Sequence, residues 1–193
     1  MSHRAQVIAA TLLFLCILLP GSALAENKKH HLGFALGYEK LLSDDLGGTY
    51  SGIDFTNSGY GALAYRFSVK RNLDLTLDAR STISKQTQGA FDVTLTNSYF
   101  GPGIRLIGPN EGLRMYVQGN FFFVEEQVEA ESGGVTISDS ENDVGFGVSA
   151  GVDIRAGNLL SVPIEANYMY GKPADDISGV GINVGLTFNF GDL

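Results

Sequence analysis

The chain has 193 residues, with 13 lysines and arginines against 21 aspartates and glutamates, and a formal net charge of −8 at pH 7. This length suits one domain. An acidic chain without a basic stripe cannot neutralise phosphates, which excludes nucleic acid as an expected partner. The single cysteine, Cys16, excludes a disulfide framework.

Residues 1–25 are predicted to be a cleaved secretory signal peptide. Arg4 provides a basic start, residues 7–19 form an apolar run too short for a spanning helix, and residues 23–25 have the small-x-small pattern of a cleavage site. A retained membrane anchor is the alternative. Cleavage would remove Cys16 and Arg4, which leaves residues 26–193 with 12 basic and 21 acidic residues, a net charge of −9.

Residues 26–193 are predicted to form one domain of eight β-strands, because apolar and polar or small residues alternate along them with the period of a strand. The expected strands are residues 32–39, 60–67, 73–80, 92–106, 113–123, 144–155, 160–170 and 179–190.

The strand at residues 179–190 carries the clearest signal. Every second residue from Val180 to Phe190 is apolar, whereas the residues between them are glycine, asparagine or threonine. About ten residues of such alternation let a tilted strand cross the hydrocarbon layer with lipid on one side and a polar lumen on the other. Only a closed barrel bonds every backbone group of such strands in lipid. We therefore predict an all-β fold, an eight-stranded antiparallel up-and-down transmembrane β-barrel.

The fourth strand is less regular than the others. Val93 and Leu95 fall on one parity, whereas Phe100 and Ile104 fall on the other. If all of them face lipid, one extra residue must be absorbed, and we expect a β-bulge within residues 97–99.

The connections alternate in length, which is typical of bacterial outer-membrane barrels with short periplasmic turns and long outer loops. The short ones are residues 68–72, 107–112 and 156–158, and the long ones are residues 41–57, 81–91, 125–143 and 171–178. Residues 124–143 carry seven acidic and no basic residues. These charges are expected to keep the loop solvated, with capture of divalent cations that bridge to lipopolysaccharide as the alternative.

With these strands and turns, residues 31–190 resemble the small eight-stranded outer-membrane barrels of the OmpA, OmpX and opacity-protein type. The last strand is similar to their C-terminal assembly signal, carried here by Asn183, Gly185, Phe188 and Phe190, although residues 191–193 follow the final aromatic residue. The resemblance implies a place in the bacterial outer membrane among its lipid and lipopolysaccharide, and recognition by the barrel-assembly machinery.

The lumen is the expected place for polar chemistry. An eight-stranded barrel is just filled by its side chains, and charges inside it must pair because an unpaired buried charge costs several kcal/mol. Arg80 and Glu165 come from opposite walls, and we expect them to meet near mid-height. The expected ion-pair network comprises Asp78, Arg80, Glu165, Arg66, Arg105, Arg114 and Asp153.

A non-enzymatic structural or surface-interaction protein with a plugged lumen is therefore the predicted function. A narrow channel for ions or small solutes is one alternative, and a lipid A-modifying enzyme is another. Such an enzyme needs a nucleophile and a base at the outer rim, but His30 and His31 are expected at the periplasmic end, and the pairs at residues 43–44 and 139–140 are typical of solvated loops. No catalytic residue, metal site or cofactor is expected, and the oligomeric state stays open.

Overall fold

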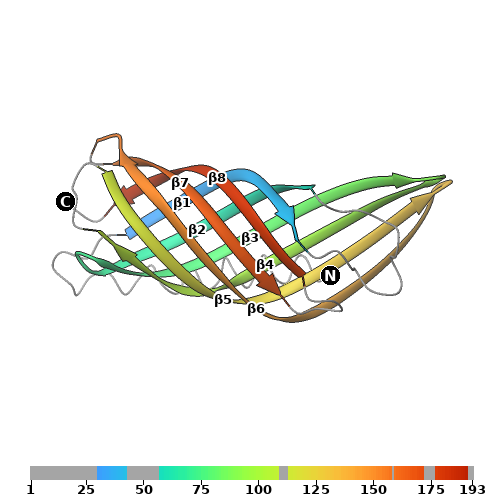
Figure 1. The fold of residues 1–193 in the computed structure, drawn as a ribbon, viewed down its shortest axis with the longest axis horizontal. Helices are drawn as coiled ribbons and strands as arrows, with labels where there is room; N and C mark the ends of the chain where they lie inside the picture. Colours follow the sequence, from blue (N-terminus) through green and yellow to red (C-terminus); the bar gives the residue numbers. More distant parts are fainter. Residues whose placement is uncertain (1–29, 43–56, 109–112, 158, 172–176, 191–193) are drawn as a thin grey trace.

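Eight antiparallel strands close into a barrel in chain order, within the part of the chain that the computed structural model describes (Figure 1). The described residues are 30–42, 57–108, 113–157, 159–171 and 177–190, so the predicted signal peptide and the residue pair 43–44 lie outside them. The strands are β1 (His30–Leu41), β2 (Asn57–Lys70), β3 (Leu73–Gln88), β4 (Phe91–Ile107), β5 (Leu113–Ser132), β6 (Val135–Arg155), β7 (Leu160–Gly171) and β8 (Ile177–Phe190). The predicted fold class is confirmed.

The barrel closes where β1 pairs with β8. Their register runs without a break from His30 opposite Phe190 to Leu41 opposite Gly179. Closure leaves no strand edge inside the bilayer, where an unbonded backbone group would cost several kcal/mol. Within the described ranges, no helix is long and apolar enough to cross a membrane.

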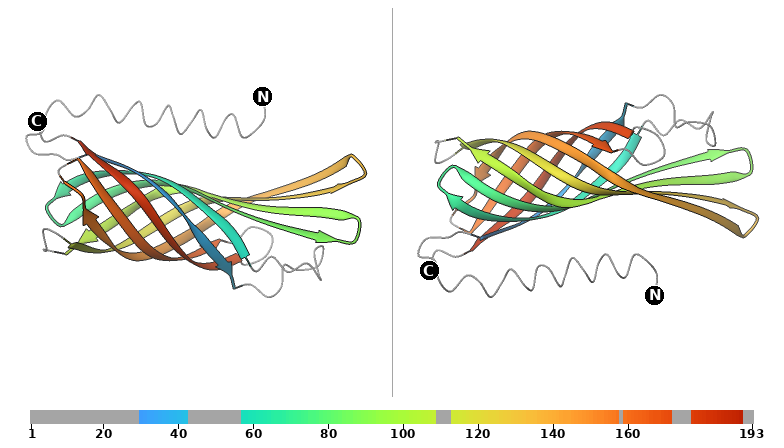
Figure 2. Two further views of the ribbon diagram at one scale, coloured as in Figure 1. Left: turned by 90° about the horizontal axis from the view of Figure 1, so that it is seen from above. Right: turned by 90° about the horizontal axis from the view of Figure 1, so that it is seen from below.

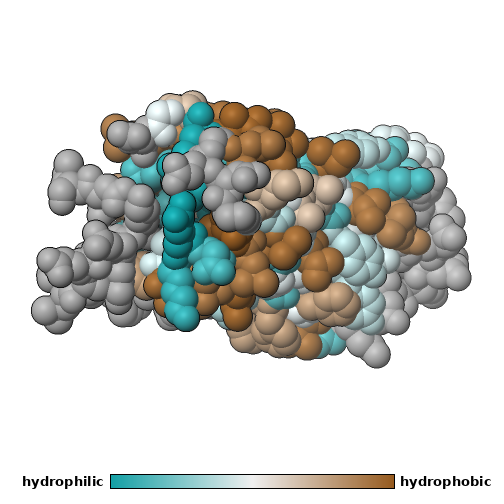
Figure 3. Space-filling view, turned by 60° about the vertical axis from the view of Figure 1, so that its left-hand side comes forward, coloured by the Kyte–Doolittle hydropathy of each residue, from teal (hydrophilic) through white to brown (hydrophobic). Residues whose placement is uncertain are grey.

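Side chains alternate between the lumen and the outer wall as the sequence pattern predicts. On β3, Asp74 and Asp78 are buried in the lumen, whereas Leu75 between them is 48% exposed. On β8, Asn183 points inward and its neighbour Val184 points outward and is exposed. Apolar side chains therefore gather over the barrel wall, as Figure 3 shows for one face of the molecule, and this is the surface that lipid covers.

Two predicted outer loops are wrong, because the structure has β-hairpins in their place. The segment 81–91 belongs to β3 and β4, which meet in a turn at Gly89, and 125–143 belongs to β5 and β6. Gly133 and Gly134 both have positive φ, 59° and 83°, which suits a two-residue hairpin turn. The acidic and serine-rich composition of residues 125–143 favoured a loop. However, a strand that lies in water can have polar side chains on both faces and still pair with the neighbouring strand.

We call the part of these hairpins beyond the membrane the extended sheet. It comprises residues 81–88 of β3, 91–98 of β4, 125–132 of β5 and 135–143 of β6, and Figures 1 and 2 show it projecting past the rest of the barrel. β4 and β5 stay paired as far as Asp92 and Glu131, so the four strands continue as one sheet.

The outer wall changes from apolar to polar along a single row of paired residues. The last apolar row is Ala79, Phe100, Phe123 and Val144, and the next outward-facing row is Ser81, Ser98, Glu125 and Asn142. Each row crosses all four strands in register, so the change from apolar to polar occurs at the same row on every strand. It indicates where the strands leave the hydrocarbon layer.

The predicted β-bulge in β4 is also wrong. The register of β4 with β3 is unbroken from Phe91 to Leu106, and Val93 and Leu95 point to the inner side, where they are 5% and 1% exposed. These two residues lie in the extended sheet, so they never needed to face lipid. The pairing of β2 with β3 does shift in register, between Ser68 and Lys70.

The orientation of the barrel can be tested by epitope insertion. An epitope placed between Gly133 and Gly134 should bind antibody on intact cells, because this turn ends the extended sheet. The same epitope between Arg71 and Asn72, in the short turn at the opposite end, should bind only after the outer membrane is permeabilised. Labelling of the second site on intact cells would reverse the assignment.

Candidate functional site

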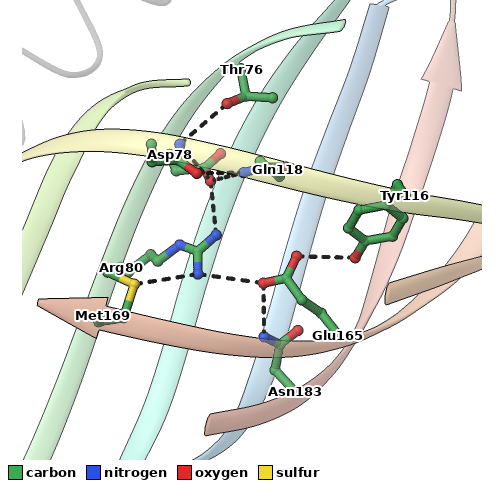
Figure 4. Close-up of polar contacts among 9 residues, drawn as sticks. Thr76, Asp78, Arg80, Tyr116, Gln118, Glu165, Met169 and Asn183 are labelled. Atoms are coloured by element: carbon green, nitrogen blue, oxygen red, sulfur yellow. Dashed lines mark hydrogen bonds and ion pairs between the residues drawn. The ribbon is translucent and has the colours of Figure 1, made fainter. Parts of the chain in front are cut away.

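A polar network centred on Arg80 fills the middle of the lumen (Figure 4). Arg80 on β3 contacts two carboxylates, with Nη2 3.0 Å from Asp78 Oδ2 and Nη1 3.4 Å from Glu165 Oε1 on β7. The side chains are almost fully buried. The structure thus brings together the three residues that were predicted to meet at mid-height.

Neutral side chains add hydrogen bonds to one oxygen of Asp78. Gln118 Nε2 donates to Asp78 Oδ2 at 2.6 Å, and Asn120 Nδ2 donates to the same oxygen at 3.2 Å. Asn120 also donates to Thr76 and accepts from Gln118. Several donors on one carboxylate oxygen offset the loss of water at a buried charge.

Glu165 is held in the same way from the other side. Tyr116 donates its hydroxyl hydrogen to Oε2 at 3.0 Å, and Asn183 Nδ2 donates to Oε1 at 3.2 Å. Asn183 was predicted only as part of the assembly signal. Sequence reasoning missed Tyr116, Gln118 and Asn120 as partners, although their inward parity on β5 was the signal that could have found them.

The other predicted network residues lie nearer the end of the barrel opposite the extended sheet, and they do not join Arg80. Arg105 Nη2 is 3.6 Å from Asp153 Oδ2, and its guanidinium lies over the ring of Tyr116 at 3.3 Å. Arg66 donates to Thr187 Oγ1 at 2.6 Å. Among the described residues, neither Arg66 nor Arg114 has an ion pair with a carboxylate.

An apolar cluster lies directly against the network. Tyr99, Phe122, Val124 and Met169 are all at most 2% exposed. The Arg80 guanidinium carbon is 5.7 Å from the centre of the Phe122 ring, and its Nη1 is 3.8 Å from the sulfur of Met169. A second cluster, comprising Leu41, Val93, Leu95 and Val128, lies farther toward the extended sheet. Buried polar side chains, which include Glu39, Thr82, Asn97 and Glu126, lie between the two clusters, so apolar and polar layers alternate along the lumen.

One small cavity lies in the middle of the lumen. A cavity of about 40 Å³ lies between the central network on one side and Arg66 and Arg105 on the other. Its lining also includes Arg80, Tyr116 and Glu165. A single water needs roughly 10–15 Å³ by the same kind of measure. This cavity suits a few waters and is not an open passage.

A serine, a histidine and an asparagine come together at the end of the barrel opposite the extended sheet. His31 Nε2 lies 3.0 Å from Ser68 Oγ, and His31 Nδ1 lies 2.6 Å from Asn189 Oδ1. However, Ser68 donates its single hydrogen to Asp74 at 2.6 Å. Asn189 Oδ1 can only accept, so the ring hydrogen of a neutral His31 lies on Nδ1. The hydroxyl hydrogen of Ser68 is bonded to Asp74 and not to His31, so His31 does not act on Ser68 as the base that activates a nucleophile.

Aromatic side chains surround the seam between β1 and β8. The ring of Phe190 stacks on His30 with centroids 5.9 Å apart, and His30 also contacts Phe67 and hydrogen-bonds the Tyr65 hydroxyl at 2.5 Å. Phe188 and Phe190 both face outward. Aromatic rings prefer the level of the membrane interface, so this end of the barrel matches the position expected for them.

A closed barrel with an apolar wall and a filled lumen defines a transmembrane β-barrel protein of the bacterial outer membrane. The chain belongs to the family of the outer membrane protein beta-barrel domain, whose model matches residues 9–190. Among curated proteins, none matches this sequence.

Solved structures of small outer-membrane barrels share the fold. Neisserial surface protein A has a TM-score of 0.63 at 14% identity, and Ail, the attachment invasion locus protein of Yersinia pestis, has 0.61 at 16%, in a crystal with the heparin analogue sucrose octasulfate. Each match covers 86% of this chain and 100% of the other. OprG from Pseudomonas aeruginosa has a TM-score of 0.52 at 10% identity, covering 88% and 98%.

The importance of the central network can be tested by removing its cation. Arg80→Leu strands two buried carboxylates and should lower the free energy of unfolding by roughly 3–5 kcal/mol, measured by urea titration of the detergent-folded protein. Arg80→Leu with Glu165→Leu should recover part of this loss. Lys85→Leu, which removes an exposed charge of the same strand, is the matched control. An unchanged urea midpoint for Arg80→Leu would contradict the network.

Proposed function

We propose that this chain is a non-enzymatic outer-membrane protein with a plugged lumen, and that its extended sheet binds a partner at the cell surface. The observation that carries the proposal is the unpaired edge of β6. Pairing with β7 begins at Gly145, so Val135–Val144 are bonded to β5 alone within the described chain. All ten of these residues are exposed.

An unpaired strand edge in water is a binding surface. Backbone N–H and C=O groups at such an edge bond to an extended segment of another chain by adding a strand to the sheet. On β6 the N–H groups of Ser140 and Val144 already donate to Asp139 and Asp143, so an added strand pairs with the other backbone groups of the edge. Edges that serve no purpose are usually kept short or covered. The edge of β6 is long, and it stands beyond the level at which the wall becomes polar.

The charge of the extended sheet restricts its partner. It carries eight acidic residues and one basic residue, which are Asp92, Glu125, Glu126, Glu129, Glu131, Asp139, Glu141 and Asp143 against Lys85. Such a surface repels polyanions. The polysulfated ligand seen with Ail is therefore a poor model for the ligand of this chain.

The channel and enzyme alternatives find less support. Passage through the lumen would require the Arg80 network and the cluster around Phe122 to move aside together. For the enzyme alternative, Ser68 donates its hydroxyl hydrogen to Asp74, so His31 does not activate it as a nucleophile. Planar-bilayer recordings should show no steady conductance, and a stable open level would favour the channel alternative instead.

The surface-binding role can be tested by shortening one hairpin. Deletion of residues 126–141, with Asn-Gly joining Glu125 to Asn142, uses a pair that already face each other and a turn that suits a hairpin. The variant should still fold, as shown by heat-modifiable migration on gels. Cells that carry it should lose adhesion to immobilised serum and matrix proteins relative to cells with the full chain, and equal adhesion would contradict the proposal.

We further propose that Asn183, Gly185, Phe188 and Phe190 act as the signal for the barrel-assembly machinery. Phe188→Ala with Phe190→Ala should lower the amount of folded barrel in the outer membrane and raise periplasmic degradation. Phe121→Ala with Phe123→Ala removes two outward-facing rings elsewhere in the wall and is the matched control. Equal abundance of the two double variants would argue against a terminal signal.

A further inference from the structure

The two faces of β6 differ in charge within the extended sheet. Asp139, Glu141 and Asp143 pair with Val128, Glu126 and Val124, whose side chains are buried on the side that continues the lumen. We call this side the inner face. The intervening residues of β6 face outward, and they are the neutral residues Thr136, Ser138, Ser140 and Asn142. All three carboxylates of this free edge strand therefore belong to the inner face.

The same face carries a strip of apolar side chains. Val93, Ala130 and Ile137 are paired in one row across three strands, and Leu95 and Val128 form the next row toward the barrel. The strip starts from the buried cluster with Leu41 and runs toward the hairpin turns.

The outer part of this strip is exposed to water. Phe91 is 51% exposed, Val135 is 64% exposed and Ile137 is 68% exposed, although all three stand beyond the level at which the wall becomes polar. Large apolar side chains gathered on one face outside a membrane mark an interaction site. The one basic residue of the extended sheet, Lys85, has the outward parity of Ile83, so it does not neutralise the inner face.

We propose that the inner face of the extended sheet binds a basic amphipathic peptide segment in extended form. The side chains that this segment turns toward the sheet are apolar at one end and cationic at the other, because Val135 and Ile137 precede Asp139, Glu141 and Asp143 on the same face of β6. This inference rests on the proposed surface-binding function and names the class of its partner. The apolar side chains of the segment cover Phe91, Val135 and Ile137, and its cations lie beside Asp139, Glu141 and Asp143. The three carboxylates favour a cationic partner by charge complementarity. The apolar strip favours a partner that also has apolar side chains, which a simple cation lacks.

The direct test is the binding of a synthetic peptide to the full chain in nanodiscs of zwitterionic lipid, followed by fluorescence anisotropy. Every second residue of this lysine–leucine peptide is leucine in one half and lysine in the other half, with serine at the positions between them. Binding should weaken as salt is raised, because the charges are exposed. The same peptide with glutamate in place of lysine, and the same peptide with serine in place of leucine, should both bind far more weakly. Equal binding of either control peptide would overturn the proposal.

Matched variants assign the binding to the inner face. Asp139→Asn, Glu141→Gln and Asp143→Asn together should weaken binding of the lysine–leucine peptide by about tenfold, from roughly half a kcal/mol per exposed pair. The control, Glu125→Gln, Glu129→Gln and Glu131→Gln, removes the same charge from the outward face of β5. If both triple variants lose the same binding affinity, the affinity depends on net charge and not on the inner face, and the assignment is wrong.

The apolar strip has its own pair of variants. Ile137→Ser should weaken binding, whereas Ile83→Ser, which changes an exposed residue of the outward face, should not. Heat-modifiable migration identifies the variants that remain folded. If no basic peptide binds the wild-type chain, yet the 126–141 deletion still abolishes adhesion of whole cells, the proposed function stands and this assignment of the partner fails.

Discussion

The rest of the structure depends on the requirement that every backbone N–H and C=O group in the bilayer finds a partner within the protein. Eight antiparallel strands satisfy it only by closing β1 onto β8, from His30 opposite Phe190 onward. Closure fixes which face of each strand meets lipid and which meets the lumen. The two-residue alternation of the sequence follows from this division, as does the small width of the lumen.

The narrow lumen makes each buried charge depend on groups from several strands. Arg80 comes from β3, its carboxylate partner Glu165 comes from β7, and Gln118 on β5 donates to the second carboxylate, Asp78. These contacts join walls that are not neighbours in the sheet. The apolar cluster around Phe122 then covers the network on its outer side, so the interior resembles a protein core more than a pore.

Outside the hydrocarbon layer the constraint is relaxed, and the pattern of the strands changes. Beyond the row of Ser81 and Glu125, the outward face becomes polar while apolar residues such as Leu95 occupy the inner face. The strand edges no longer have to be closed, and β6 runs past its neighbour β7. The same four strands thus provide a rigid wall within the membrane and a surface with a free edge above it.

The sequence alone determined the eight strands, their direction and the inward position of residues such as Arg80 and Glu165. The alternation of side chains along a strand is a local property, so it can be recognised without knowing which strands pair with each other. It did not determine that Val93 and Leu95 turn inward, or that acidic segments stay in strands, because both depend on where the sheet leaves the membrane. It also missed Gln118 and Tyr116 as partners of the buried carboxylates. Those contacts depend on the register of all eight strands together, which only closure of the barrel decides.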